Sequence, residues 1–423
     1  MARPRLVALI AGTSGAKLYS MGLNILALAL TARWLGPDGR GMLATLTTWV
    51  NTAAMLASLS LGSVAMQRLA GCRDSARFGD VFHALLRFAW ILAICAWGVM
   101  ALLWLARGSA LFGNAPAWAL ALACLMLPCL VWEGYANALL TTIERLRVFN
   151  LSLVTGRSLM LLGLLCLAVL DGVTLAGVLA VSVLAQCWIA GYSFPTLRAW
   201  ARQHQAAGAS TTEGRALLHG GMRLHLNTVG TLALNMAGTL LIANMLGARE
   251  AGFFQLAQQL MTVLLVIPQS ASLVIYGRQG ELGPDGVWPL QRKMLLGVVA
   301  LTAIAGLAMA MSAHIWLPWV AGPGYEPAIP LLLAMLPILV MLSFSSMMAS
   351  QWIGRGLFLT ASLLTVLVGL VNLLASSVWI PEFGMMGAVY AQLLALLVAV
   401  FTNSSMALWC ELKSRRLRAE SGK

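Results

Sequence analysis

The stretch Leu35-Gly36-Pro37-Asp38-Gly39-Arg40-Gly41 stands between two long apolar runs, and a similar stretch returns as Leu246-Gly247-Ala248-Arg249-Glu250-Ala251-Gly252. The two copies are 211 residues apart (246 − 35 = 211), which is half of the 423-residue chain. The same shift carries Asn24 onto Asn235 and Gly113 onto Gly324. We therefore expect one structural unit that is present twice.

The composition indicates that most of the chain lies in a membrane. Hydrophobic residues make up 60% of the sequence and charged residues 10%, and the mean hydropathy is +0.85. Because a bilayer core of roughly 30 Å needs about 20 apolar residues per helix, the apolar runs predict an all-α polytopic protein. About twelve transmembrane helices are expected, at 6–32, 41–67, 83–106, 117–143, 151–170, 175–196, 219–246, 252–276, 294–316, 329–353, 357–380 and 385–409.

Six of these spans fall in each copy of the repeat. An even number of spans per copy predicts two parallel six-helix lobes, related by an axis along the membrane normal. We expect an N-terminal lobe at 1–200, a polar cytoplasmic linker at 201–218, a C-terminal lobe at 219–412 and a basic cytoplasmic tail at 413–423. Prolines inside three spans, Pro128, Pro268 and Pro337, are expected to interrupt their helices.

The distribution of cations predicts the orientation. With the N-terminus in the cytoplasm, the inner segments hold 20 of the 27 Lys and Arg residues, the outer segments hold four, and three lie inside helices. This asymmetry satisfies the positive-inside rule, so both termini are expected to be cytoplasmic. The net charge of +13 is then explained by topology and by contact with membrane lipids, and no nucleic-acid partner is expected.

Several classes of protein are excluded by missing features. The sequence shows no nucleophile motif, no P-loop and no metal-ligand spacing, and no loop is long enough for an enzyme domain. We therefore expect no catalytic residues, no metal and no cofactor. The seven cysteines lie in helices or on the predicted cytoplasmic side, so structural disulfides are not expected either.

Polar residues at helical spacing mark four of the predicted spans, the first, second, seventh and eighth. In the second and eighth spans they occupy sectors of about 120° at 100° per residue, and repeat-equivalent positions carry them in both copies. One interpretation is hydrogen bonding between packed helices. The other, which the repetition favours, is a shared hydrophilic substrate cavity lined by Lys17, Ser20, Asn24, Thr48, Asn51, Thr52, Asn227, Thr231, Asn235, Gln255, Gln259 and Thr262.

Three charged residues within spans have open roles. Lys17 lies too deep for easy snorkelling, and it is a candidate for either an anion contact or a structural ion pair. Glu133 is the only carboxylate well inside a span. It is a candidate either for ion coupling or for a charge pair with Lys17 or Arg157, and the sequence leaves both roles open.

The turn between the first two spans also carries a family resemblance. Thr31-Ala32-Arg33-Trp34-Leu35-Gly36-Pro37-Asp38-Gly39-Arg40-Gly41 resembles the Arg-x-Leu-Gly-Pro-x-x-x-Gly signature of Wzx/PST-type polysaccharide flippases in the MOP (multidrug/oligosaccharidyl-lipid/polysaccharide) superfamily. Leu246–Ala257 is similar to the second-half signature, and Gly324-Tyr325-Glu326-Pro327-Ala328 precedes the tenth span. The resemblance extends over nearly the whole chain.

The resemblance implies a function and partners. Members of this family are thought to move a polyprenyl-pyrophosphate-linked oligosaccharide from the inner to the outer leaflet of the bacterial cytoplasmic membrane, for surface or exopolysaccharide synthesis. They are thought to do so by alternating access through a cavity between two lobes. The implied partners are the lipid-linked oligosaccharide, membrane lipids, and polysaccharide polymerase and export machinery. The implied cavity helices are the first, second, seventh and eighth, which carry the polar faces here.

Other functions remain as alternatives. A MATE-like multidrug antiporter shares the superfamily, although Lys17 and a single buried carboxylate argue against a cationic substrate. A major-facilitator carrier would carry a Gly-x-x-x-Asp-Arg-x-Gly-Arg-like motif after its second span, which residues 71–78 do not supply. Lipid II flippases of the superfamily typically have fourteen spans, and a membrane glycosyltransferase would show a larger outer loop.

Overall fold

The computed structural model describes residues 3–69, 77–170, 172–204 and 211–421. Within that part of the chain every regular element is a helix. The helices are α1 (Arg3–Ala57), α2 (Leu61–Arg68), α3 (Arg77–Arg107), η1 (Gly108–Phe112), α4 (Ala117–Cys124), α5 (Leu127–Thr142), α6 (Leu146–Val169), α7 (Leu175–Gln203), α8 (Thr211–Asn235), α9 (Ala237–Met245), α10 (Ala248–Leu264), α11 (Val266–Ala321), η2 (Pro323–Tyr325), α12 (Ala328–Ala334), α13 (Leu336–Gly354), α14 (Phe358–Phe383) and α15 (Met385–Ser421).

The chain divides into two compact units. Unit 1 comprises Met1–Thr228, Gly247–Gly252 and Val320–Gly322, and unit 2 comprises Val229–Leu246, Phe253–Trp319 and Pro323–Lys423. The boundary falls inside α8, so the first part of this helix belongs to unit 1 and its last part to unit 2. The predicted lobe boundaries at 200 and 219 remain predictions.

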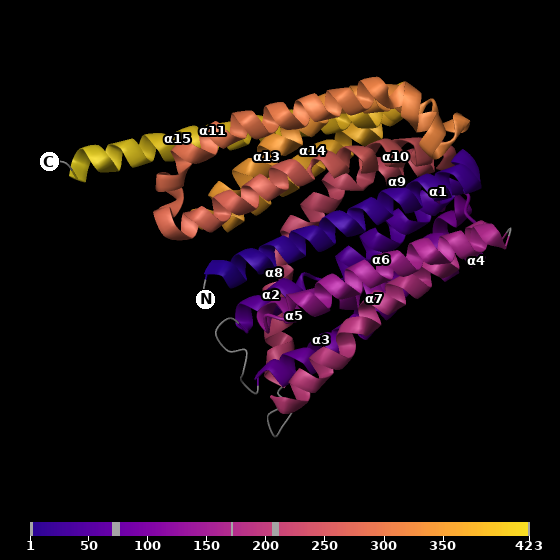
Figure 1. The fold of residues 1–423 in the computed structure, drawn as a ribbon, viewed down its shortest axis with the longest axis horizontal. Helices are drawn as coiled ribbons and strands as arrows, with labels where there is room; N and C mark the ends of the chain where they lie inside the picture. Colours follow the sequence, from indigo (N-terminus) through magenta and orange to yellow (C-terminus); the bar gives the residue numbers. More distant parts are fainter. Residues whose placement is uncertain (1–2, 70–76, 171, 205–210, 422–423) are drawn as a thin grey trace. The chain divides into compact units, whose positions relative to one another are not determined.

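Unit 1 is a helical bundle around α5. Helices α2, α3 and α7 pack against α5, while α1 packs on α6 and α6 packs on α7 (Figure 1). The core between them is apolar and includes the fully buried side chains of Phe78, Phe82, Leu127 and Tyr135. Because many outward-facing side chains of the same helices are also apolar, this bundle suits a hydrocarbon solvent.

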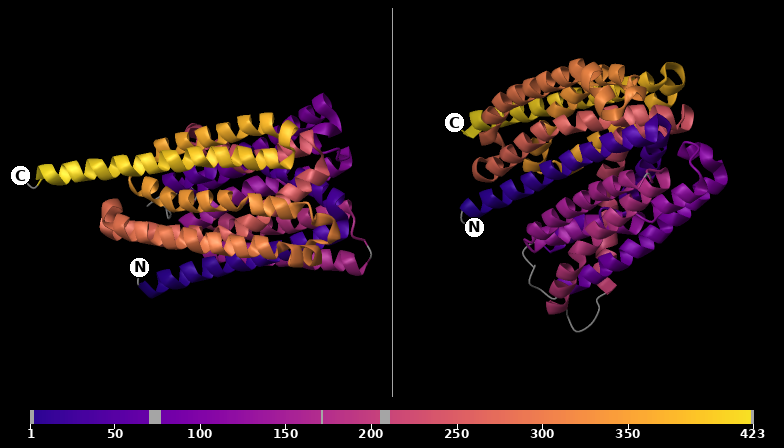
Figure 2. Two further views of the ribbon diagram at one scale, coloured as in Figure 1. Left: turned by 90° about the horizontal axis from the view of Figure 1, so that it is seen from above. Right: turned by 45° about the vertical axis from the view of Figure 1, so that its right-hand side comes forward.

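In unit 2, α14 lies beside α15, α12 and α13 also contact α15, and α9 contacts α14. Helix α15 extends past the ends of α13 and α14 (Figure 2). Its 37 residues correspond to about 55 Å at 1.5 Å per residue. Because this length exceeds the roughly 30 Å of a bilayer core, part of α15 stands outside the hydrocarbon.

The number of membrane-spanning helices is lower than the twelve expected from the sequence. In the described part of the chain, nine helices are long and apolar enough to cross a membrane, or up to eleven if each of two bent helix pairs is one span. The two predicted spans 6–32 and 41–67 account for part of the difference, because residues 18–32 of the first and all of the second fall within one 51-residue candidate, Leu18–Arg68. The protein is an all-helical, multi-span membrane protein.

A Gly-Pro kink interrupts α1 between those two predicted spans. Gly36 has φ 67° and ψ 179°, a conformation that is essentially restricted to glycine, and Pro37 follows it. The pentapeptide Leu-Gly-Pro-Asp-Gly at 35–39 occurs again at 282–286, where Gly283 adopts φ 70° and ψ 166° inside α11. The same five residues thus produce the same break in two helices, and the repeat analysis missed the second copy because it is not shifted by 211 residues.

The order of elements repeats along the chain. A long helix, a short 3-10 helix, a broken helix and two long helices follow one another as α3, η1, α4–α5, α6 and α7, and again as α11, η2, α12–α13, α14 and α15. Pro128 and Pro337 stand second in α5 and α13, directly after the breaks, and α12 and α13 are bent by 46°. Pro268 is the third residue of α11 and also follows a break, at Leu265.

The two copies of the glycine turn pack against each other within unit 1. A Cβ on Gly41 would lie 1.8 Å from the carbonyl oxygen of Ala248, and one on Gly252 would lie 2.8 Å from the Cα of Gly41. Gly113 contributes to the same contact, because its Cβ would lie 3.2 Å from that of Ala248. Only residues without a side chain allow the two backbones to approach this closely.

Candidate functional site

The polar residues predicted on the first two spans all lie on α1 in unit 1. Asn24 is exposed, whereas Ser20 and Thr48 are buried at 8% and 7% exposure. Asn51 and Thr52 are half-buried. The amide nitrogen of the Asn51 side chain donates to the backbone oxygen of Thr47 at 2.7 Å. The side chain of Lys17 lies outside the described residues, so its anion contact stays a prediction.

The polar residues predicted on the seventh and eighth spans lie on α8 and α10. In unit 2 the amide nitrogen of Gln258 donates to the backbone oxygen of Asn235 at 3.0 Å, which joins these two helices. Asn235 is exposed and donates to the backbone oxygen of Thr231, also at 3.0 Å. Some of the polar side chains therefore do connect helices, as the hydrogen-bonding interpretation expects.

The α10 face has both exposed and buried members. Thr262 is exposed, and its hydroxyl donates to the backbone oxygen of Gln258 in the same helix at 2.8 Å. Gln259 is exposed as well, whereas Gln255 is buried at 9%. Asn227, on the part of α8 that belongs to unit 1, is also exposed. Exposed polar side chains on apolar helices are costly in hydrocarbon and suit a water-filled space.

Glu133 lies on α5 in unit 1 and has a neutral partner. Its Oε2 accepts a hydrogen bond from the amide nitrogen of Gln186 on α7, a residue that is 5% exposed. Among the described side chains, no ion pair joins Glu133 to the half-buried Arg157 on α6. The sequence analysis missed Gln186, although an amide inside the apolar run 175–196 is a detectable signal.

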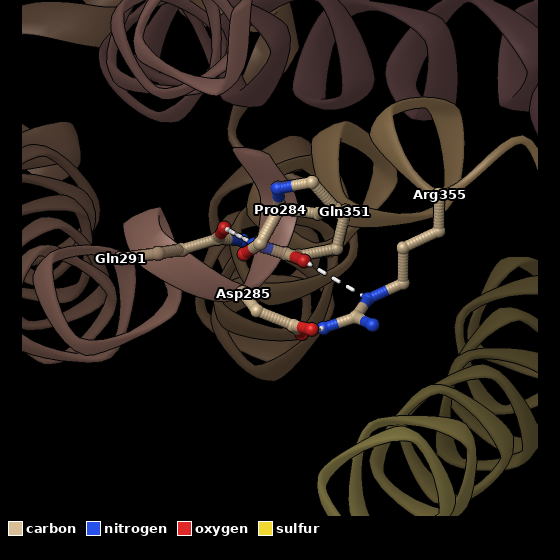
Figure 3. A network of polar contacts seen from close by, with 5 residues as sticks. All are labelled: Pro284, Asp285, Gln291, Gln351 and Arg355. Carbon is tan, nitrogen blue, oxygen red and sulfur yellow. Dashed lines mark hydrogen bonds and ion pairs between the residues drawn. The ribbon is translucent and has the colours of Figure 1, made fainter. Parts of the chain in front are cut away.

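A second polar network, also missed from the sequence, lies in unit 2 (Figure 3). The amide nitrogen of Gln351 donates to Oε1 of Gln291 at 2.5 Å, and Arg355 donates from Nε to Oε1 of Gln351 at 3.3 Å. The guanidinium of Arg355 also reaches Asp285 at 2.5 Å. Gln351 and Gln291 are 1% and 0% exposed, so the network connects α13 to the segment of α11 that follows the Gly283-Pro284 kink.

A small pocket of about 150 Å³ opens beside this network and receives residues from α11, α13 and α15. Arg292 lies over the ring of Trp288 at 5.7 Å, and its Nη1 is 3.7 Å from Oε2 of Glu411. Together with Asp285 and Arg355, these groups place two cations and two anions around the pocket. The pocket has balanced charge and is too small for an oligosaccharide.

Substitution of Gln351 by leucine is expected to lower the free energy of unfolding by about 1–3 kcal/mol, because it leaves the buried Oε1 of Gln291 without its donor. Thermal unfolding of the purified protein in detergent measures the loss. The double variant Gln291→Leu/Gln351→Leu removes both partners and is expected to be more stable than the sum of the single losses predicts. Strict additivity of the two losses would contradict a coupled network.

The helix arrangement defines a multi-span membrane protein with a MATE- and MurJ-like fold. The lipid II flippase MurJ in an inward closed conformation aligns with a TM-score of 0.72 at 12% identity, covering 93% of this chain and 87% of that one. An inward-facing multidrug resistance MATE transporter of the MOP superfamily aligns with a TM-score of 0.67 at 16% identity, covering 92% and 94%. An outward-facing MATE transporter aligns with a TM-score of 0.62 at 17% identity, covering 97% and 96%.

The family follows from a match in sequence. A family model described as "Polysaccharide biosynthesis protein" matches residues 7–276, which is more than half of the chain. The chain therefore belongs to the polysaccharide biosynthesis protein family, and it shares its fold with a MATE transporter of the MOP superfamily. A search of curated proteins found no match.

Proposed function

We propose that this protein translocates a polyprenyl-pyrophosphate-linked oligosaccharide repeat unit from the inner to the outer leaflet of a bacterial cytoplasmic membrane. The observation that carries the proposal is the match to the polysaccharide biosynthesis protein family. The exposed polar side chains on the repeated helices support it. A pyrophosphate and its sugars need a hydrated path across hydrocarbon, whereas the polyprenyl tail does not. Alternating access between two lobes would provide that path to each leaflet in turn.

The proposal includes an architecture. If α1 crosses the membrane twice, once on each side of the Gly36 kink, and each bent pair crosses once, the chain has twelve crossings. These crossings would form two parallel six-helix lobes with cytoplasmic termini. The polar residues of α1, α8 and α10 would line one substrate cavity, with Lys17 as an anion contact.

Deletion of the gene in its host tests the function. The lipid-linked oligosaccharide is expected to accumulate at the inner leaflet, and the surface polymer is expected to be lost, until the gene is restored. Protection of the oligosaccharide from an externally added glycosidase measures its leaflet. Unchanged polymer combined with altered drug tolerance would instead support the alternative, a MATE-like or major-facilitator-like small-molecule antiporter.

We further propose that Glu133 couples transport to protons. The support is its hydrogen bond to Gln186, because a neutral amide can pair with a protonated or an ionised carboxyl group. The variant Glu133→Gln is expected to fold, because the new amide oxygen still accepts from Gln186. Its transport rate in proteoliposomes is expected to become independent of pH.

The matched control for this variant is Glu382→Gln, which removes an exposed carboxylate near the end of α14. This variant is expected to keep the pH dependence of the unsubstituted protein. If Glu133→Gln transports with an unaltered pH profile, Glu133 has only a structural role.

A further inference from the structure

Glu213 holds three helices of unit 1 together by its two carboxylate oxygens. It stands in the first turn of α8 and is 8% exposed. Arg68, the last residue of α2, places Nε 2.9 Å from Oε2, and Arg77, the first residue of α3, places Nε 3.0 Å from Oε1. One carboxylate thus receives two guanidinium groups, one on each oxygen.

The same face of α8 continues along α2 beyond this ion pair. A Cβ on Gly220 would lie 2.8 Å from Cγ1 of Val64, and one on Gly221 would lie 2.6 Å from the backbone oxygen of Leu59. We call this contact, from Glu213 through Gly220 and Gly221, the α2–α8 interface. The absence of side chains at both glycines allows the two helices to meet at van der Waals distance.

Two hydrogen bonds end the α2–α8 interface. The hydroxyl of Ser60 lies 3.2 Å from Nδ1 of His225 and 3.1 Å from Oγ1 of Thr228. Ser60 belongs to the break between α1 and α2, and Tyr135 fixes that break by donating to the backbone oxygen of Ser58 at 2.8 Å. Directly after Thr228, at Val229, α8 passes into unit 2. Any motion that draws residues 211–228 of α8 away from α2 must therefore break these hydrogen bonds.

The two arginines fit phosphate as well as they fit a carboxylate. Guanidinium groups form charge-assisted hydrogen bonds to pairs of oxygens, and phosphate presents more oxygens and more charge than a carboxylate does. The side chains of Arg68 and Arg77 are 32% and 46% exposed, so they are accessible to a ligand, whereas that of Glu213 is only 10% exposed. The positive-inside distribution puts both arginines at the cytoplasmic ends of their helices, where the proposed cargo is made.

We propose that Arg68 and Arg77 form a loading site for the phosphate groups of the anionic lipid-linked cargo, and that Glu213 occupies this site as an internal substitute until cargo displaces it. The inference rests on the proposed function. Displacement releases the start of α8 from α2 and α3, so the arrival of cargo weakens the α2–α8 interface. The chain then couples loading to the motion that transport requires.

Binding and exchange measurements on the full-length protein in phosphatidylcholine nanodiscs test the proposal. The probe is polyprenyl pyrophosphate, and hydrogen–deuterium exchange over residues 211–228 reports separation of α8. In the unsubstituted protein the probe is expected to raise exchange in this segment. Glu213→Gln is expected to raise exchange without the probe and to bind the probe about tenfold more tightly, because a charge-assisted competitor is removed.

Three further variants separate loading from folding. Arg68→Gln/Arg77→Gln is expected to raise exchange yet bind the probe about tenfold more weakly. Arg202→Gln removes an exposed cation from the last turn of α7 and is expected to behave as the unsubstituted protein. Glu213→Asp, which keeps the charge, provides a folded comparison if Glu213→Gln does not accumulate. The inference is wrong if Glu213→Gln binds the probe with unchanged affinity. It is also wrong if Glu213→Asp binds the probe more weakly while its hydrogen–deuterium exchange is unaltered.

One further arm identifies the source of the phosphate. Phosphatidylglycerol nanodiscs without the probe are expected to leave exchange low. If this lipid alone raises exchange as much as polyprenyl pyrophosphate does, the arginines bind membrane headgroups and the assignment to cargo is wrong.

If the deletion strain retains its polymer, the proposed function fails. If the polymer is lost but Glu213→Gln binds the probe with unaltered affinity, only the loading site fails.

Discussion

The variant Gly41→Ala is expected to prevent accumulation of the folded protein. The added methyl group would lie 1.8 Å from the backbone oxygen of Ala248, well inside the sum of the van der Waals radii. No rotamer relieves this clash, because an alanine side chain has none and the opposing atom belongs to the backbone. The two turns must move apart, at a cost of at least about 3 kcal/mol, which is at the upper end of overpacking.

The measurement is the yield of monodisperse protein from membranes, together with the midpoint of thermal unfolding. Gly98→Ala is the matched control, because Gly98 lies on the exposed side of α3 and its Cβ would meet nothing within 4 Å. Alanine has the higher helix propensity, so the control is expected to be at least as stable as the unsubstituted protein. Normal yield and stability of Gly41→Ala would show that the two turns do not meet as the structure places them.

Sequence patterns predicted the two glycine turns but not the contact between them. Spacing placed two similar glycine turns at half-chain separation, and the structure packs Gly41 and Gly252 against one another within unit 1. That contact was not predictable, since nothing in a one-dimensional repeat indicates which parts of the two copies meet. The kink at Gly283 was overlooked for a related reason, because identical local chemistry need not follow the register of a duplication.

The functional residues divide in a similar way. Helical spacing identified polar faces that the structure keeps exposed at Asn24, Gln259 and Thr262. It missed Gln186 and the Gln291–Gln351 pair, whose hydrogen bonds join residues of different helices. Periodicity detects sets of residues on one face, whereas a hydrogen bond between two isolated amides depends on tertiary packing.

The variant Gln259→Leu/Thr262→Leu is expected to reduce polymer export at least about tenfold, equivalent to about 1.4 kcal/mol in the transport barrier, while the protein stays folded. Both side chains are exposed, and the hydroxyl of Thr262 donates to its own helix, so neither fills the core. The native amide and hydroxyl groups can form hydrogen bonds with a polar cargo, whereas leucine cannot. Surface polymer in the complemented deletion strain, corrected for the amount of protein in membranes, measures the effect.

The control for this variant makes the same chemical change on another helix. Ser404→Leu/Ser405→Leu also replaces two exposed polar side chains by leucine, on α15, and the hydroxyl of Ser405 likewise bonds to its own helix, to Phe401 at 2.9 Å. Because α15 carries none of the predicted cavity residues, this double variant is expected to export normally. Equal losses in both would mean that leucine harms the protein wherever it is placed, whereas normal export in both would remove α10 from the transport path. Loss in the α10 variant alone is the result that a hydrated cavity along this helix requires.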